Sequence, residues 1–356
     1  MRAAMPEGGN AAPAPRLAQA VPARELADLW QGVAPSPFAG QRLARMRLRN
    51  GWRLLAIVGL GMLLGVVLTS AIPQYDTLVA NVQVQATIAG LDPLARNVEI
   101  RATNRRVAGD TLRAEDAAAG QVGAEFFSGF TQPAVTHYYS TDPVPLARIG
   151  ASTFAVGGGE RSAIFEAFDY TQAGAHMHLL AGRLPQTAPA GGAIEALVTS
   201  SMARAEGLQL GDPLTATFLG TQDRPVTARV VGIWEPTQPN ENFWNGLSFE
   251  PIITDTAAIY SVLLDQRDYV TSMATLDLVQ NAQHWVYYTD TRRISAGGMG
   301  SVADAVNRAR AQVPSRIGAA SASSATVYSL LPAAITGLRR QLALLAQPLY
   351  IVVAQV

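Results

Sequence analysis

The longest run of hydrophobic positions lies in the first fifth of the chain, at Leu54–Ile72. It reads LLAIVGLGMLLGVVLTSAI, 19 residues with no charge. As a helix at about 1.5 Å per residue, the run would be roughly 28 Å long, close to the ~30 Å hydrocarbon core of a bilayer. The core helix of a soluble protein keeps a polar face, and this run has none. A cleaved leader would be much shorter than the 53 residues in front of it. The pattern therefore predicts a retained transmembrane helix over residues 54–73.

A second uncharged run, Gln341–Val356, directly follows Arg339 and Arg340. We expect it to be the start of a second transmembrane helix, and an amphipathic helix lying on the membrane surface is the alternative. Residues 74–340 would then be tethered to the membrane on both sides. Apolar residues continue at helical spacing over Ile72–Ile88, which favours stalk helices that rise from the membrane.

Strand patterns and helix patterns interleave within residues 74–340 without strict alternation, which favours an α+β fold with two lobes. The predicted strands are Asn97–Thr103, Ile194–Val198, Leu214–Phe218, Val226–Trp234 and His284–Thr289. The predicted helices are Ala114–Ser128, Ser200–Glu206, Ser301–Gln312 and Ala325–Leu344, the last interrupted early by Pro332. Gly207 suits a helix C-cap, and Gly211–Pro213 reads as a turn.

The charge distribution gives the orientation of the span. Residues 1–53 hold eight arginines against three acidic residues, whereas residues 74–340 hold nineteen against 24. By the positive-inside rule, the N-terminus is cytoplasmic and residues 74–340 are extracytoplasmic. Residues 1–40, rich in Ala, Pro and Gly, are expected to be a disordered tail, and residues 41–53 a basic juxtamembrane segment. The acidic body argues against nucleic-acid binding.

Two residue types are absent from the chain. All 27 basic residues are arginine, and there is no cysteine. Without lysine there is no Walker A motif, no kinase strand lysine and no Schiff base. Without cysteine there is no disulfide, no thiol nucleophile and no thiolate metal site. An ATPase of ordinary P-loop design is therefore excluded.

Several segments resemble the extracytoplasmic domains of FtsX-like, MacB-type ABC transporter permeases. The strongest part is IEALVTSSMARAEGLQLGDPLTATF, which contains Gly207–Asp212, followed by the Val-Val-Gly-Ile of VTARVVGIW, at Val230–Ile233. Ala181–Pro185 (AGRLP) and the arginine-flanked first span, which ends in Pro-x-Tyr, also fit. The resemblance covers roughly residues 45–356.

The resemblance implies a permease subunit of a bacterial plasma (inner) membrane, with a large extracytoplasmic domain between its first two spans. It implies a separate cytoplasmic ABC ATPase as partner, contact with membrane lipids, and a homodimer or pairing with a second permease half. The outer domain would transmit ATP-driven motion to export or extract a substrate. A membrane-anchored extracytoplasmic sensor or binding protein is the alternative, and an anchored hydrolase is a third.

No residue is assigned a catalytic, cofactor-binding or metal-binding role. His176 and His178 would face one side of a strand, but no third metal ligand lies nearby in sequence, so packing or surface roles are favoured. His137 and His284 are interpreted as amphipathic strand-edge residues.

A serine hydrolase lacks support because there is no GxSxG motif. Gly157–Gly159 and Gly297–Gly300 lack a phosphate-binding context. Trp234, Phe243 and Trp244 are expected to pack in the core rather than to contact cargo.

Overall fold

The computed structural model describes residues 37–103, 109–153, 161–187, 193–218, 225–254, 257–274, 281–317 and 324–353. The segments 1–36 and 157–159 lie outside this description, and with them most of the predicted tail and one glycine loop. The chain divides into two units, residues 1–74 and residues 75–356.

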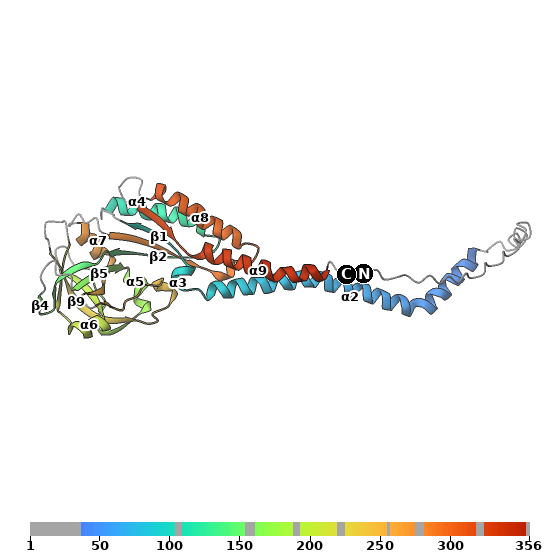
Figure 1. Ribbon diagram of the computed structural model, residues 1–356, viewed down its shortest axis with the longest axis horizontal. Coiled ribbons are helices and arrows are strands. Elements are labelled where there is room, and N and C mark those ends of the chain that lie inside the picture. The colour runs from blue at the N-terminus through green and yellow to red at the C-terminus, as the bar shows by residue number, and fades with distance from the viewer. Residues whose placement is uncertain are drawn as a thin grey trace, which may run out of the picture. The chain divides into compact units, whose positions relative to one another are not determined.

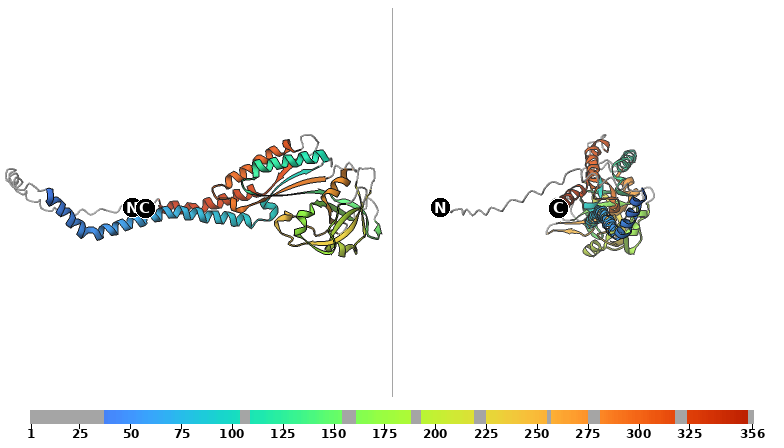
Figure 2. Two further views of the ribbon diagram at one scale, coloured as in Figure 1. Left: turned by 180° about the vertical axis from the view of Figure 1, so that it is seen from behind. Right: turned by 90° about the vertical axis from the view of Figure 1, so that its right-hand side faces the viewer.

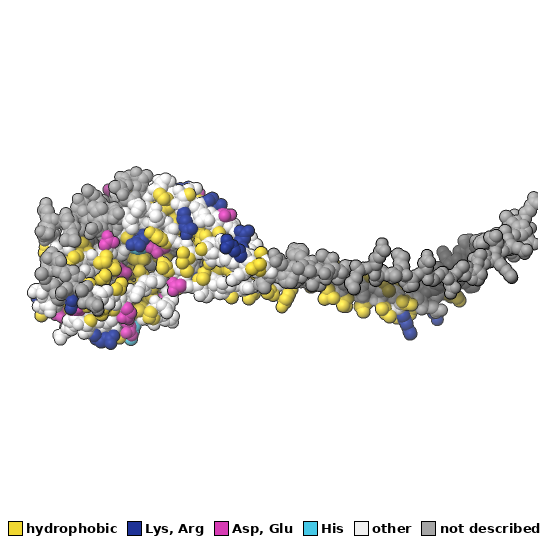
Figure 3. All heavy atoms as spheres, viewed as in Figure 1, with side chains coloured by type: hydrophobic (Ala, Val, Ile, Leu, Met, Phe, Trp, Pro, Cys, Tyr) yellow, Lys and Arg dark blue, Asp and Glu magenta, His cyan; other side chains and the backbone are white. Residues whose placement is uncertain are grey.

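Helix α2 (Pro37–Ala89) forms the described part of the first unit and, from Tyr75, the start of the second, and it carries the predicted span. Within the described residues, Gly51–Ala89 is the one helix segment long and apolar enough to cross a membrane, and no residue of its most apolar window is buried. From Leu54 to Leu68 the large apolar side chains are exposed, as Figure 3 shows by the row of yellow side chains along α2. A helix exposed and apolar on all sides fits lipid and not water, so the length and composition expected of the span are confirmed.

The second unit mixes helices and strands, as the sequence predicts (Figure 1). Its longer helices are α4 (Gly109–Val122), which continues as a π-helical turn over Gly123–Phe127, α6 (Ser200–Glu206), α7 (Gln266–Ala274), α8 (Met299–Arg316) and α9 (Leu331–Val353); α3 (Pro93–Arg96) and α5 (Tyr170–Ala173) are single turns. The strands are β1 (Val98–Thr103), β2 (Thr131–Thr141), β3 (Val144–Ile149), β4 (Ser152–Thr153), β5 (Arg161–Phe168), β6 (Met177–Gly182), β7 (Ile194–Thr199), β8 (Pro213–Thr217), β9 (Pro225–Pro236), β10 (Ile252–Ile253), β11 (Ala258–Asp265), β12 (Asn281–Thr289) and β13 (Ser324–Tyr328).

Six of the strands pair in a closed ring. Their order is β11-β7-β9-β8-β3-β5, and β5 pairs back onto β11 in parallel. The side chains that alternate toward the inside form one apolar cluster, which includes Phe165, Val198, Leu214, Val230 and Val262. Closing a sheet in this way removes its free edges and fills the interior with side chains.

The other main strands extend the sheet outward from β5, in the order β2-β12-β1-β13. Helices α4 and α8 cover one face of this extension (Figures 1 and 2). Alternate residues of β1 and β12, among them Ile100 and Trp285, point into the apolar cluster beneath these helices. Neighbouring residues such as Glu99 and His284 point to the opposite face.

The segments that carry the family resemblance lie together. The N–H of Gly211 donates to the carbonyl of Val230 over 2.7 Å, and the N–H of Val230 donates to the carbonyl of Asp212 over 2.9 Å. Gly211 has φ +94°, which favours glycine. At Gly232 a Cβ would lie 2.6 Å from the carbonyl oxygen of Arg183, so close packing of β6 on β9 requires glycine.

Most predicted elements of this unit are confirmed to within a few residues, including the left-handed Gly207 after α6, with φ +65°. The helix predicted over Ala325–Leu344 is wrong in its first part. Ser324–Tyr328 is strand β13, with Ala325 and Val327 buried against β1 and the residues between them exposed. Pro332 lies in the first turn of α9 and does not interrupt it, because the first turn needs no N–H from that residue.

Candidate functional site

Residues 75–89 of α2, the first residues of the second unit, are attached to its core by hydrogen bonds and apolar contacts. The N–H of Ala296 donates to Oδ1 of Asn81 over 2.7 Å, and Nε2 of Gln85 reaches the carbonyls of Arg292 and Ile294 over 3.5 and 3.4 Å. One face of the helix thus carries both polar anchors and buried apolar residues, since Val84 and Ile88 are fully buried. We refer to Asn81 and Gln85 with their partners as the interlock.

Helix α9 returns beside this part of α2, as Figures 1 and 2 show. Ile335 and Leu338 of α9 belong to the same apolar cluster as Val84 and Ile88. The start of α9 is held by Arg310 of α8, whose guanidinium donates to the carbonyls of Val327 and Ser329. Both helices are therefore built into one core at this end of the second unit.

A row of polar side chains crosses the face of the sheet opposite α4 and α8. Strand pairing places Arg101 of β1 opposite His284 of β12, and His284 opposite Tyr138 of β2. Two residues after Tyr138 on the same strand, Ser140 is opposite Glu166 of β5. Paired residues and residues two apart share a face, so these side chains lie together where the sheet extension meets the strand ring.

His284 is hydrogen-bonded on both ring nitrogens. Nδ1 lies 2.6 Å from Oε1 of Glu99, and Nε2 lies 2.8 Å from Oγ of Ser140. Burial lowers the pKa of His284, and the hydrogen bond to Glu99 opposes that shift. The prediction of a strand-edge histidine is wrong here, because β12 lies between β1 and β2 and His284 is 5% exposed.

Glu99 is held in place by a loop of the second unit. Its Oε2 accepts from Nδ2 of Asn245 over 3.2 Å, and Oδ1 of Asn245 accepts from Asn97 over 3.1 Å. Asn245 has φ +49°, in the left-handed region that asparagine tolerates better than most residues. The next residue, Gly246, has φ +80°, and a Cβ there would lie 2.9 Å from that of Leu94.

Glu166 is the second buried carboxyl on this face. It is 5% exposed, and Oγ of Ser261 donates to its Oε2 over 2.6 Å. Burial raises the pKa of Glu166 to about 7, and the hydrogen bond from Ser261 opposes that rise. A carboxyl with such a pKa changes its charge near neutral pH, which is typical of functional sites and also of buried structural groups.

Polar side chains that include Glu99, Arg101, Ser140, Glu166 and His284 line a pocket of about 330 Å³. Nε of Arg101 is buried and has no hydrogen-bond partner within the described part of the chain. The pocket thus combines an unused donor, two buried carboxyls and a histidine–serine hydrogen bond.

His137 lies on the opposite face of β2, away from this pocket. Its ring stacks on that of Trp285, with centroids 5.3 Å apart, and its Nε2 is 3.0 Å from Nε2 of Gln283. Burial lowers the pKa of His137 to about 4, and the nearby Asp116 opposes the shift. The strand-edge interpretation is wrong for this residue as well, since β2 pairs on both sides, and the side chain has a packing role.

His176 and His178 do not form a shared site. Nδ1 of His176 is 2.9 Å from Glu241, and its ring stacks on Phe243 at 3.9 Å, whereas Nδ1 of His178 is 3.3 Å from Glu235. Within the described ranges, no group of three His, Cys, Asp or Glu residues is placed to hold a metal ion. The packing role expected for His176 is confirmed.

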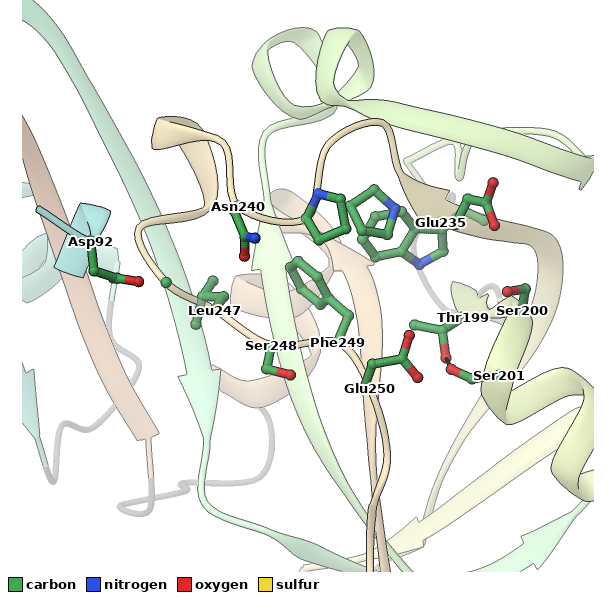
Figure 4. Close-up of a pocket in the computed structure, with 14 residues that line it drawn as sticks. Asp92, Thr199, Ser200, Ser201, Glu235, Asn240, Leu247, Ser248, Phe249 and Glu250 are labelled. Atoms are coloured by element: carbon green, nitrogen blue, oxygen red, sulfur yellow. Dashed lines mark hydrogen bonds between the residues drawn. The ribbon is translucent and has the colours of Figure 1, made fainter. Parts of the chain in front are cut away.

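Trp234 of β9 and Phe249 of the loop after it line a second, smaller pocket of about 170 Å³ (Figure 4). Trp234 and Trp244 are fully buried, which confirms that they pack in the core, and Phe243 is partly buried against the same apolar cluster. Figure 4 shows Glu250 pointing toward Thr199 and Ser201 on one side of the pocket. Nε1 of Trp234 is buried without a partner among the described residues.

The Glu99–His284–Ser140 arrangement is not predictable from the sequence. The three residues lie far apart in the chain and match no motif, and only the strand register brings them together. One signal concerns Glu99 alone: it lies between Val98 and Ile100, and a polar side chain in an apolar strand needs a buried partner. Gly297 and Gly298 precede α8, and Met299 and Gly300 belong to its first turn.

No protein-family model and no curated protein matches the chain. Among solved structures, the periplasmic region of MacB from Actinobacillus actinomycetemcomitans matches with 13% identity and a TM-score of 0.32, covering 61% of this chain and 85% of that one. A domain of a protein assigned as a permease, from Porphyromonas gingivalis, matches with 14% identity and a TM-score of 0.30, covering 67% and 90%. These neighbours belong to the class named by the sequence resemblance. At such scores neither assigns an activity to this chain.

Proposed function

We propose that this chain supplies the first transmembrane helix and the extracytoplasmic domain of the permease subunit of an ABC transporter. The ATPase is a separate cytoplasmic subunit, and the permease pairs with a second copy of itself or with another permease half. Residues 74–340 lie outside a bacterial plasma membrane and couple ATP-driven motion to export or extraction of a substrate. The proposed orientation follows from the arginines that precede the span.

One observation carries this proposal: a single helix, α2, contains both the apolar span and the interlock residues Asn81 and Gln85. Movement of residues 75–89 would be transmitted through these hydrogen bonds to the segment 292–296. That segment follows β12 directly, and β12 carries His284. The absence of lysine is consistent with nucleotide chemistry in another subunit.

The coupling is tested with the variant Asn81→Ala/Gln85→Ala in the full transporter with its ATPase, reconstituted in nanodiscs. A fluorophore on Ser152→Cys, the only thiol in a chain without cysteine, reports motion of the outer domain. We expect ATP to change the emission with the native interlock but not with the double variant, while ATP hydrolysis continues. Gln83→Ala, an exposed change on the same helix, is the control. An unchanged ATP response in the double variant would contradict the coupling.

The alternative is a membrane-anchored sensor or binding protein without a transport role. The polar pocket of about 330 Å³ favours this alternative, because a pocket of that size accommodates a small ligand. Affinity purification of the full-length protein under mild detergent conditions separates the two functions. A transporter subunit co-purifies with a Walker-motif ATPase in stoichiometric amount, and a sensor does not.

A further inference from the structure

Three side chains on adjacent strands form a directed chain of hydrogen bonds. A carboxylate has acceptors only, so Glu99 requires the proton of His284 to reside on Nδ1, 2.6 Å away. Nε2 then has a free lone pair and accepts from the hydroxyl of Ser140, 2.8 Å away. Asn245 donates to the other oxygen of Glu99 and fixes the carboxylate in this orientation. Ser140 is thereby polarised toward loss of its proton.

The same pocket has room for a substrate with an electrophilic carbonyl group, and it contains a hydrogen-bond donor for the carbonyl oxygen. Ser140, His284 and Arg101 all line its volume of about 330 Å³. The backbone of β2 around Ser140 is paired with β12 and β5, so its amides are not oriented toward the pocket. Arg101 has an unpartnered, buried Nε within the described structure, and a guanidinium can stabilise a developing oxyanion. Nucleophile, base, orienting carboxylate and oxyanion donor thus meet at one pocket.

We propose that Ser140, His284 and Glu99 form a nucleophilic site that hydrolyses small polar carboxylic esters. Oγ of Ser140 attacks the ester carbonyl carbon as its proton passes to Nε2 of His284, and Arg101 donates to the carbonyl oxygen. The bond to the alcohol oxygen breaks, and the alcohol leaves with the proton from His284. Water, deprotonated by His284, then attacks the acyl carbon. The bond to Oγ of Ser140 breaks, Oγ takes the proton back from Nε2 of His284, and the acid leaves.

The lining of the pocket defines the substrate class. Its charged residues include Arg101, Asp142 and Glu166, so a long alkyl chain would leave these groups desolvated without partners. A volume of about 330 Å³ is at the small end for ligand pockets. The site therefore suits short acyl groups on small polar alcohols and excludes lipid-sized esters. This activity does not depend on the proposed transport function, and either one can fail without the other.

The test uses the full-length protein in detergent, with a fluorophosphonate probe and p-nitrophenyl acetate. We expect one fluorophosphonate adduct, located on Ser140 by peptide mass spectrometry. Ser140→Ala should abolish the adduct, and Ser140→Ala and His284→Gln should each lower p-nitrophenyl acetate turnover at least 100-fold. Arg101→Gln should lower turnover at least tenfold, because it removes the proposed oxyanion donor. Ser248→Ala, an exposed serine of the smaller pocket, should change neither readout.

The adduct is measured on the native protein, so this test does not require that any variant folds. Near-ultraviolet circular dichroism of the same sample shows whether the native protein is folded. A folded protein with no adduct on Ser140, or an adduct on another serine alone, overturns the proposal. Turnover of p-nitrophenyl acetate that is equal in Ser140→Ala and in the native protein overturns it as well. In those cases the three side chains are a structural hydrogen-bond chain.

Discussion

Glu166→Gln tests how the charge on a buried carboxyl affects the stability of the folded protein. Neither packing nor strain should change the direction of the effect. Replacing Glu166 by Gln keeps the shape of the protonated acid, and its amide oxygen can accept from Ser261 as Oε2 does now. Gln cannot ionise, however. The variant therefore removes only the cost of holding a charge at a position that is 5% exposed.

The magnitude follows from linkage. A carboxyl whose pKa is raised from 4.5 to about 7 costs about 3 kcal/mol more to ionise in the folded than in the unfolded protein, at about 1.4 kcal/mol per pH unit. Because the folded pKa is the higher one, the native protein loses this stability as the pH rises from 4 through 7. Glu166→Gln should match the native protein at pH 4 and exceed its free energy of unfolding by about 3 kcal/mol at pH 8.

The measurement is urea unfolding of the full-length protein in detergent at pH 4 and pH 8, followed by tryptophan fluorescence. The signal is suitable because Trp234, Trp244 and Trp285 are buried in the second unit. Glu250→Gln, an exposed carboxyl, is the matched control and should show no pH-dependent difference. A gain for Glu166→Gln that is equal at both pH values, or a loss at pH 8, would refute the reasoning.

Three further predictions concern the stability of the second unit, each measured by urea unfolding. Gly232→Ala should cost about 1–3 kcal/mol, because its Cβ would lie 2.6 Å from the carbonyl oxygen of Arg183. The control is Gly129→Ala in the same unit, where a Cβ has nothing within 4 Å; it should leave the stability unchanged, and equal effects of the two changes would contradict this account. Tyr287→Phe should cost about 1 kcal/mol through the lost 2.6 Å hydrogen bond to the carbonyl of Ala119. Asn245→Gly should cost about 2 kcal/mol by leaving the buried Glu99 with one partner fewer, and a neutral result would show that the loop does not hold Glu99.

The elements predicted well were those with strong local signals. The span needed only its composition, and the strand, helix and glycine order around Gly207 needed only local turn chemistry. Strands β5 and β11 are not predicted from the sequence. They pair with each other within the strand ring, and their hydrophobic pattern is short and lacks the clear alternation of a half-exposed strand. β13 was interpreted as helix because it directly precedes α9, although Thr326 and Val327 favour a strand.

The polar pocket could not be predicted, for a different reason. Glu99, Ser140 and His284 come from three strands that the sequence does not show to be neighbours, and a register change of one residue would place any of them on the opposite face. At Glu99 the sequence indicates a polar residue within an apolar strand. It does not indicate which partner satisfies it, because that depends on pairings between residues more than 140 positions apart.

The pairing of β1 with β13 determines how the second unit would respond to force. β1 follows α2 through the short turn α3, and β13 directly precedes α9, so the two strands extend from the two helices as neighbours. Their antiparallel register begins with Glu99 opposite Tyr328 at the helix end and closes with Thr103 opposite Ser324. Pulling the two helices apart would load this ladder one residue pair at a time, as in unzipping, whereas moving both helices in the same direction would leave it unloaded. Because β13 is an edge strand, it would separate from β1, and β1 would remain paired with β12.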